Sequence, residues 1–473
     1  MHIHVIGLCG VGMSAVAMLQ RDAGHTISGS DEGFYPPVSD YLALHKFDFK
    51  QGYKASNIPA QTDAFMIGKN AKLTPEQNEE VKAAVESGKP IYSYPELLSQ
   101  VSADKERICV VGSYGKSTCT ALLSFLLEHA GLEPSYFMGA IASGMPRTSK
   151  KASGELFVIE GDEYPSANDD DRSKFMHYAP GHVLMTAATH DHVNVFPTPE
   201  DYKAPFIELV KGMPEVGTLV VCADNEEALE VVNRSGKTAV TYGFSKDADY
   251  HVQSVDYGTE SFLHILMPEG ATLTFKTSLL GAHNMQNICG VVAMILENEW
   301  LDYTAIAAGL KDFQGIRRRL DRLTPEGSVP VHEGFGSSYE KARAAIEAMK
   351  LHYADKKLII VFEPHTFSWR NRDALHWYDD VFEGAENVLV YEPATQGSGS
   401  HKQLTQDEIV ERVKAAGYET VAIHNAEDGL AALSPLVTEE TAILLLTSGD
   451  LGGLIKKIPE WIKNSTQTLL QTA

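Results

Sequence analysis

A glycine loop that opens into a helix carries the strongest chemical signal in the chain. It follows the apolar run Ile108–Val111 and reads Gly112-Ser113-Tyr114-Gly115-Lys116-Ser117-Thr118. The backbone N–H groups of such a loop, with the positive end of the helix, bind phosphate oxygens. Lys116 can reach the β and γ phosphates of ATP, and the Ser117 hydroxyl can hold Mg²⁺. We therefore predict ATP binding here; a chance Gly-Lys-Ser at a turn is the alternative.

Two further strand ends carry groups that bind cations. Apolar residues at 157–159 lead into Glu160-Gly161-Asp162-Glu163-Tyr164, and Val183-Leu184-Met185 leads toward Thr189-His190-Asp191-His192. Carboxylates packed together repel one another, so a cation is their natural partner. Oxygen and imidazole ligands beside a phosphate loop suit Mg²⁺ or Mn²⁺ better than structural zinc. The alternative is a solvated acidic loop with surface histidines.

A second glycine turn lies near the N-terminus. Gly7-Leu8-Cys9-Gly10-Val11-Gly12 follows the predicted strand Ile3–Ile6, and Asp31 comes after a second predicted strand, Thr26–Ser28. This arrangement resembles a dinucleotide site in which the aspartate binds a ribose hydroxyl. The spacing, however, is GxxGxG instead of GxGxxG. It fits any nucleotide diphosphate at a helix N-terminus, and a purely structural turn remains the alternative.

The elements that would position these motifs alternate between apolar strands and amphipathic helices. This alternation predicts an α/β fold with parallel sheets. Helices are expected at about Met13–Asp22, Ser117–His129 and Tyr339–His352, and further strands at Leu358–Phe362, Val388–Tyr391, Thr420–Ile423 and Ala442–Leu446. We predict three domains, at 1–104, 105–313 and 314–473.

Composition excludes several classes of protein. The chain has 473 residues, 44% of them hydrophobic, and a net charge of −23, which disfavours nucleic acid as a partner. The five cysteines have no zinc spacing and are expected to be buried thiols. Neither a signal peptide nor a run long enough to span a bilayer is recognisable. We therefore expect a cytoplasmic protein with no membrane partner; its oligomeric state is not predicted.

Taken in order, these motifs resemble those of the Mur ligases, the ATP-dependent amide-forming enzymes of peptidoglycan synthesis. The resemblance covers the whole chain and continues with Gly281-Ala282-His283-Asn284-Met285-Gln286-Asn287 and with 313–321, FQGIRRRLD. It implies a Rossmann-like UDP-binding domain, a central P-loop-type ATPase domain and a C-terminal Rossmann-like acceptor domain. The implied ligands are ATP, Mg²⁺, UDP-N-acetylmuramate and an amino acid or short peptide.

The resemblance also implies roles for individual residues. Lys116, Glu163, His192 and Arg319 would be catalytic, with Glu163 and Ser117 on one Mg²⁺ and His192 on a second. Asn284 and Asn287 would meet adenine, and Glu333 would replace a ribose-binding aspartate. The UDP-sugar would be bound by Gly7, Gly10, Val11, Gly12, Met13, Ser30, Asp31 and Asn70. Helix capping by the asparagines and a solvated cluster at Arg317–Arg319 are the alternatives.

The acceptor is the least determined part of the prediction. Tyr35–Ser39, Glu160–Tyr164 and Asp171–Tyr178 resemble the members that attach L-alanyl-γ-D-glutamyl-meso-diaminopimelate in cell-wall recycling. The alternative is a ligase that adds L-alanine. The stretch Glu333–Tyr339 departs from the family pattern, which also leaves open a non-catalytic nucleotide sensor. An NAD-dependent oxidoreductase would leave Lys116 unexplained, and a P-loop switch would leave the first domain unexplained.

Overall fold

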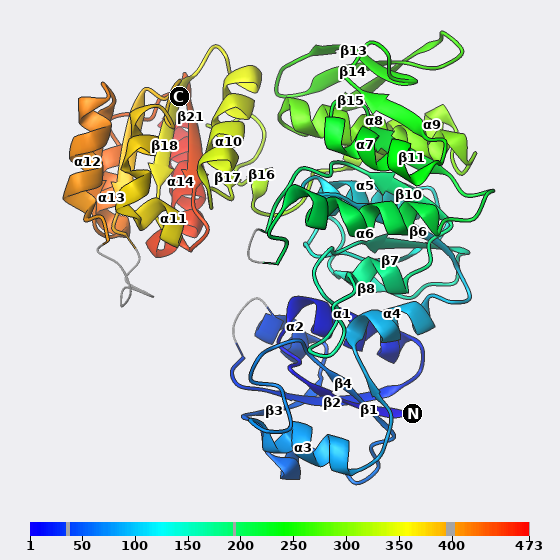
Figure 1. The fold of residues 1–473 in the computed structure, drawn as a ribbon. Helices are drawn as coiled ribbons and strands as arrows, with labels where there is room; N and C mark the ends of the chain where they lie inside the picture. The colour runs from blue at the N-terminus through cyan, green and yellow to red at the C-terminus, as the bar shows by residue number, and fades with distance from the viewer. Residues whose placement is uncertain (35–37, 193–194, 394–402, 473) are drawn as a thin grey trace. The chain divides into compact units, whose positions relative to one another are not determined.

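The computed structural model describes residues 1–34, 38–192, 195–393 and 403–472, with side chains described up to Asn464. The chain divides into two compact units. The first comprises Met1–Ser254, Leu263–Phe275 and Gln286–Phe313, and the second comprises Val255–Phe262, Lys276–Met285 and Gln314–Ala473. Figure 1 shows both, coloured from blue to red along the chain.

The first sheet contains five parallel strands in the order β3-β2-β1-β4-β5. They are β1 (His2–Ile6), β2 (Thr26–Asp31), β3 (Asp48–Gln51), β4 (Ala64–Ile67) and β5 (Ile91–Tyr92). The strand order reverses at β1, because β2 and β4 pair with its opposite edges. Such a reversal opens a crevice at the carboxyl ends of the strands, which is where parallel sheets bind ligands.

The second sheet is larger and contains ten strands in the order β15-β14-β13-β12-β11-β10-β6-β9-β7-β8. Its strands are β6 (Glu106–Val111), β7 (Ser135–Phe137), β8 (Ser149–Lys150), β9 (Leu156–Glu160), β10 (His182–Met185), β11 (Leu219–Cys222), β12 (Val240–Gly243), β13 (Tyr250–Asp256), β14 (Ser261–Leu266) and β15 (Thr272–Thr277). Strand β6 pairs in parallel with both β9 and β10. The ends of these three strands therefore meet at one edge.

Most helices up to residue 312 begin at a capping side chain or a glycine turn. They are α1 (Val11–Asp22), α2 (Val38–Leu44), α3 (Glu79–Glu86), α4 (Tyr94–Val101), α5 (Lys116–His129), α6 (Pro199–Lys211), α7 (Glu226–Ser235), α8 (Ala282–Glu297) and α9 (Tyr303–Asp312), with short 3₁₀ turns η1 (Ala55–Asn57) and η2 (Lys174–His177). Capping boxes with proline in the first turn start α4 at Ser93 and α6 at Thr198. Helices α1 and α5 lack a side-chain cap and start at glycine turns, so their first N–H groups are available to anions.

The second unit contains the third sheet, in the order β16-β17-β21-β18-β19-β20. Its elements are β16 (Arg319–Arg322), β17 (Val331–Gly334), α10 (Tyr339–His352), β18 (Lys357–Phe362), α11 (Phe367–Arg370), η3 (Arg372–Asp379), β19 (Asn387–Tyr391), α12 (Gln406–Ala415), β20 (Glu419–Ile423), α13 (Ala426–Leu433), β21 (Thr441–Leu446), η4 (Leu451–Gly453) and α14 (Leu454–Thr472). In β18, Ile360 and Phe362 join one buried cluster, whereas Ile359 and Val361 join another. Alternate residues of a strand face opposite sides, so helices cover both faces of this sheet.

The predicted α/β class with three sheet-containing regions is confirmed. Two expectations need correction. Strand β2 continues through Asp31 instead of ending at Ser28. Cys9 is only half-buried, although the other four cysteines are buried as expected. Within the part of the chain described, no helix is long and apolar enough to cross a membrane.

A buried polar network ties helix α3 to the first sheet. Glu80 is fully buried, and its Oε1 accepts hydrogen bonds from His4 Nε2 and Ser30 Oγ, both at 2.7 Å. Its Oε2 accepts bonds from Lys54 N at 2.8 Å and Asn57 Nδ2 at 3.0 Å. Four donors therefore compensate one buried carboxylate, as the cost of burying a charge requires.

Candidate nucleotide and metal site

The phosphate loop joins β6 to α5, between the ends of β9 and β10. Gly112 and Gly115 have φ values of +137° and +83°, a region that L side chains rarely adopt. A Cβ on Gly112 would collide with Thr186 Oγ1, just after β10, and one on Gly115 would meet Asn287 Oδ1 on α8 at 2.7 Å. Both positions therefore require glycine, and the loop backbone lies directly against the end of β10 and the first turns of α8.

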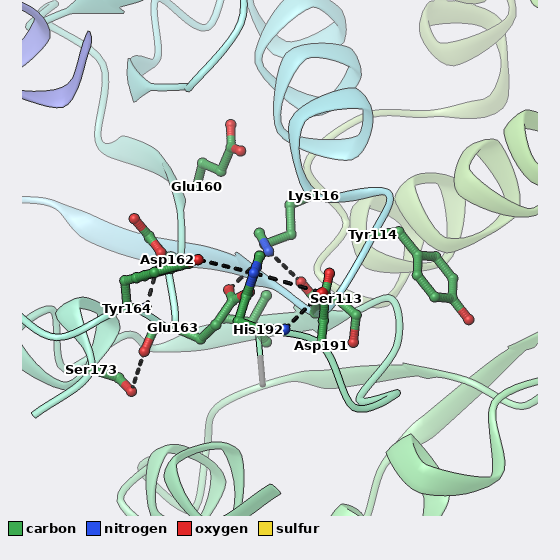
Figure 2. Close-up of polar contacts among 12 residues, drawn as sticks. Ser113, Tyr114, Lys116, Glu160, Asp162, Glu163, Tyr164, Ser173, Asp191 and His192 are labelled. Carbon is green, nitrogen blue, oxygen red and sulfur yellow. Dashed lines mark hydrogen bonds and ion pairs between the residues drawn. The ribbon is translucent and has the colours of Figure 1, made fainter. Parts of the chain in front are cut away.

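Lys116 connects this loop to the strand end at Glu163. Its Nζ donates to the Gly112 carbonyl at 2.5 Å and to Glu163 Oε2 at 2.9 Å. Figure 2 shows Lys116 beside Glu163. The Glu163 side chain is only 1% exposed. Burial, the largest influence, raises the pKa of this carboxyl group. Hydrogen bonds from His192 and Lys116 and the charge of Lys116 outweigh burial and lower the pKa to about 2.

His192 lies against the same carboxylate. It has a positive φ of +57°, which is unusual for a residue other than glycine. Its Nε2 lies 3.3 Å from Glu163 Oε1, and its Nδ1 lies 3.0 Å from the Tyr164 hydroxyl. The hydrogen bond to Glu163 is the main cause of a raised His192 pKa, which burial opposes. The structure thus brings together two of the predicted metal ligands, Glu163 and His192.

Ser117, the third predicted metal ligand, contacts a different carboxylate. Its hydroxyl donates to Glu160 Oε1 at 2.7 Å, and the backbone N–H of Gly139 donates to Glu160 Oε2 at 2.6 Å. Glu160 was predicted as one of the carboxylates at this strand end that favour a cation, but it was given no role of its own. Its position as the last residue of the buried strand β9 was the signal available, because neighbouring strand ends share an edge with the phosphate loop.

The donor set fits Mg²⁺. Glu160 and Glu163 offer carboxylate oxygens, Ser117 a hydroxyl and His192 an imidazole nitrogen, all near a loop suited to phosphates. Among the residues described, however, no three His, Cys, Asp or Glu side chains converge on one point. Mg²⁺ usually takes only one or two protein carboxylates and completes its shell with waters and substrate phosphates. The arrangement therefore suits a nucleotide-bound Mg²⁺ better than an all-protein cage.

The N-terminal glycine turn is held closed by β2. Gly7 has a φ of +92°, and both Gly7 N and Leu8 N donate to the Ser30 carbonyl, at 2.9 and 3.0 Å. Asp31 Oδ2 accepts from Cys9 N at 2.7 Å, and Asp31 Oδ1 accepts from the Tyr53 hydroxyl at 3.1 Å. Ser30 is fully buried and Met13 is 5% exposed, whereas Gly10, Val11 and Asn70 are exposed. Ser30 therefore supports the turn through its backbone carbonyl, and its buried side chain does not face solvent.

The remaining predicted residues lie on α8 and in the second unit. Asn284 and Asn287 are both buried, and the Asn284 side chain donates to the Leu280 carbonyl at 2.7 Å. Arg319 is the exposed first residue of β16. Glu333 is buried and accepts a bond from Arg318 Nε at 2.9 Å, so its carboxylate already has a cationic partner. Residues 35–37 of the Tyr35–Ser39 block lie outside the described residues.

The fold and site define an α/β protein with a phosphate-type glycine loop at the start of α5 and a separate glycine turn at the start of α1. Residues 2–106 match the catalytic domain of the Mur ligase family, and residues 110–295 match the Mur ligase middle domain. The chain belongs to the Mur ligase family, and it is an ATP-dependent amide ligase of the peptidoglycan pathway.

Individual relatives differ in the acceptor that their names give. The UDP-N-acetylmuramate–L-alanine ligase of Chlorobium chlorochromatii is 27% identical, covering 98% of this chain and 97% of its own length. The UDP-N-acetylmuramate-alanine ligase of Thermotoga maritima shares the fold, with a TM-score of 0.78 at 21% identity over 98% of this chain and 100% of its own. The UDP-N-acetylmuramate:L-alanyl-γ-D-glutamyl-meso-diaminopimelate ligase of Neisseria meningitides is 26% identical over 67% of this chain and 99% of its own, with a TM-score of 0.61.

Proposed function

We propose that this ligase joins UDP-N-acetylmuramate to the tripeptide L-alanyl-γ-D-glutamyl-meso-diaminopimelate, as a murein peptide ligase does in cell-wall recycling. Domains at 1–104, 105–313 and 314–473 would bind the UDP-sugar, ATP and the acceptor, respectively. The proposal that the central domain binds ATP rests on one observation: Lys116 of the Gly112–Thr118 loop and His192 both contact the Glu163 carboxylate.

The proposed reaction begins with activation of the muramyl carboxylate. A carboxylate is a poor electrophile, so transfer of the γ-phosphoryl group from ATP gives an acyl phosphate whose leaving group is phosphate. The Gly112–Thr118 backbone and Lys116 bind and orient the phosphates, which is the main source of catalysis in phosphoryl transfer. The amine of the acceptor then attacks the acyl carbon. Ser117 and Glu163 would hold one Mg²⁺ and His192 a second, and the charge of these ions would neutralise the phosphates.

Other predicted residues take supporting roles in the proposal. Arg319 would add positive charge to the phosphates, and Asn284, Asn287 and Glu333 would contact the nucleoside. The turn formed by Gly7, Gly10, Val11 and Gly12, with Asp31 and Asn70, would bind the UDP moiety, backed by Met13 and Ser30.

Two sequence blocks support the tripeptide. Glu160–Tyr164 and Asp171–Tyr178 resemble murein peptide ligase, and both fold onto the proposed metal cluster: Ser173 Oγ donates to the Glu163 carbonyl at 2.6 Å. The 26% identical Neisseria enzyme carries the tripeptide in its name. The loop Gln396–Ser400, whose small polar residues are compatible with room for a peptide acceptor, lies outside the described residues. L-alanine is the second candidate, favoured by the Chlorobium relative that matches 98% of the chain.

The acceptor is tested by measuring both products side by side. At matched, subsaturating acceptor concentrations, kcat/KM for the tripeptide should exceed that for L-alanine by about 10²-fold, if two remote contacts contribute about 1–2 kcal/mol each. Product formation is followed by mass spectrometry with UDP-N-acetylmuramate and ATP present. A higher kcat/KM for L-alanine would place the enzyme at the first amino-acid addition instead.

The metal site is tested by its Mg²⁺ requirement. Glu163→Gln removes a ligand charge and His192→Ala removes an imidazole, so each should raise the half-saturating Mg²⁺ concentration by roughly 10- to 100-fold. Asp312→Asn is a matched control, because Asp312 is exposed and pairs with His129 at 3.2 Å, away from the proposed metal ligands. Should both site variants keep the wild-type Mg²⁺ curve, these residues are structural.

A further inference from the structure

Lys174 lies in a confined polar position that the proposed chemistry does not use. It is the first residue of η2, and its side chain is 14% exposed. Its Nζ lies 2.5 Å from Asp162 Oδ2, and it stands over the rings of Tyr94 and Tyr164 at 5.3 and 5.6 Å from their centroids. An ammonium group has three N–H donors. Asp162 uses one, and the two ring faces attract the charge without consuming the other donors.

The segment that carries Lys174 is fixed to the proposed metal cluster. The backbone N–H of Lys174 donates a hydrogen bond to the Tyr164 carbonyl at 3.0 Å. The adjacent Ser173 hydroxyl donates one to the Glu163 carbonyl. Asp162, the partner of Lys174, directly precedes Glu163, and the Tyr164 hydroxyl contacts His192. Figure 2 shows Asp162, Glu163 and Tyr164 around this strand end. The ammonium group is therefore held at a set position relative to the phosphoryl-transfer residues.

On its other side, Lys174 is connected to the N-terminal glycine turn through Tyr94. A Cβ on Gly12 would lie 3.2 Å from the Tyr94 ring, so Gly12 packs directly on this ring. The same segment reaches the first sheet a second time, because Asn168 Nδ2 donates to the carbonyls of Asn70 and Leu73 at 2.9 and 3.2 Å. Lys174 thus lies on the route from the turn proposed for the UDP diphosphate to the cluster proposed for ATP and Mg²⁺.

We propose that Lys174 binds the reacting carboxylate of the UDP-sugar and thereby determines specificity for a sugar that bears one. This inference rests on the proposed function. A UDP-sugar whose diphosphate lies at the Gly7–Gly12 turn must extend its carboxylate toward Lys116 to receive the γ-phosphoryl group. The carboxylate passes the Tyr94 ring on this route and meets the ammonium group of Lys174.

The charges at this position are consistent with that role. An incoming carboxylate approaches Asp162, Glu160 and Glu163, all of which would repel it. Lys116 already donates to Gly112 and Glu163. Lys174, which contacts Asp162, is a second lysine beside these carboxylates. Asp162 orients its ammonium group, and a lysine can bridge two carboxylates because its donors point in different directions.

The test compares two UDP-sugars that differ in the lactyl group that bears the carboxylate. UDP-N-acetylglucosamine is UDP-N-acetylmuramate without the lactyl ether and its carboxylate. Both are titrated calorimetrically into the wild-type protein and into Lys174→Met, which keeps the length of the side chain and removes its charge. Lys150→Met is the control, because Lys150 forms a comparable ion pair with Glu128 at 2.8 Å on another edge of the same sheet.

We expect Lys174→Met to weaken binding of UDP-N-acetylmuramate by about 10-fold or more, the usual effect of losing one hydrogen bond between charged groups. Binding of UDP-N-acetylglucosamine should change by less than twofold, and Lys174→Arg should recover part of the lost affinity. The control should bind both ligands as the wild type does. A Lys174→Met variant that loses affinity equally for both ligands, or for neither, overturns the inference. If the wild-type protein itself does not bind UDP-N-acetylmuramate, the proposed function fails instead.

Discussion

Lys116→Ala should lower the rate of ATP-dependent ligation by about 10³-fold or more. The lysine follows the phosphate loop, and its ammonium group would clamp the β and γ phosphates where negative charge develops during transfer. Losing one preorganised charge of this kind costs several kcal/mol in the transition state. The measurement is ADP release in the presence of UDP-N-acetylmuramate and acceptor, with kcat and the KM for ATP determined separately.

The same substitution also removes the partner of a buried carboxylate, so the fold must be checked independently. Glu163 is 1% exposed and would lose its ion pair at 2.9 Å. Thermal stabilisation by the UDP-sugar reports on the intact fold, since a ligand that binds only the native state raises the unfolding temperature. Lys105→Ala is the control, because Lys105 Nζ donates to the backbone carbonyls of Ser153 and Gly154 beyond the opposite end of β6. Near-normal ADP release from Lys116→Ala would remove this loop from the chemistry.

The elements that the sequence predicted best are those whose signal is local. Helix α10 spans Tyr339–His352 as predicted, because Ser338 caps its first turn and its apolar residues recur at helical spacing. Strand β21 was predicted from five consecutive apolar residues, Ala442–Leu446, which parallel strands buried on both faces require. The phosphate loop was recognisable for the same reason: strand, glycine turn and helix are contiguous.

Contacts between distant residues were not predictable in the same way. The hydrogen bond from Ser117 to Glu160 joins residues 43 positions apart. It depends on β6 and β9 becoming neighbours in the sheet, which no local pattern specifies. Likewise, β2 was predicted to end at Ser28. Gly29, Ser30 and Asp31 have low strand propensity, yet parallel pairing with β1 and β3 and the bond from Ser30 to Glu80 extend the strand.

Glu80→Ala should destabilise the first sheet by about 3–5 kcal/mol, the usual cost of breaking a buried charged network by removing one member. Four donors from His4, Ser30, Lys54 and Asn57 converge on this carboxylate. The two that are fully buried, His4 Nε2 and Ser30 Oγ, would lose this acceptor in a water-poor interior. Because a chain with several sheets unfolds in more than one step, the measurement is amide hydrogen exchange. Protection in β1 and β2 should fall, while protection in β11 should not change.

The pH dependence of this effect has a defined sign. Burial, the largest influence, raises the Glu80 pKa, but the hydrogen bonds from His4, Ser30, Asn57 and the Lys54 backbone outweigh it, so the folded-state pKa is lowered. A lowered pKa contributes stability that is present above the unfolded value of about 4.3 and is lost as the pH falls through the folded pKa. The wild-type advantage in β1 protection over Glu80→Ala should therefore shrink below about pH 4.

Glu86→Ala on the same helix is the control for Glu80→Ala, since Glu86 is 65% exposed and lies 3.9 Å from Lys82. Loss of Glu86 should cost about 0.5 kcal/mol or less. Equal protection in the two variants at neutral pH would show that the Glu80 network does not hold α3 to the sheet.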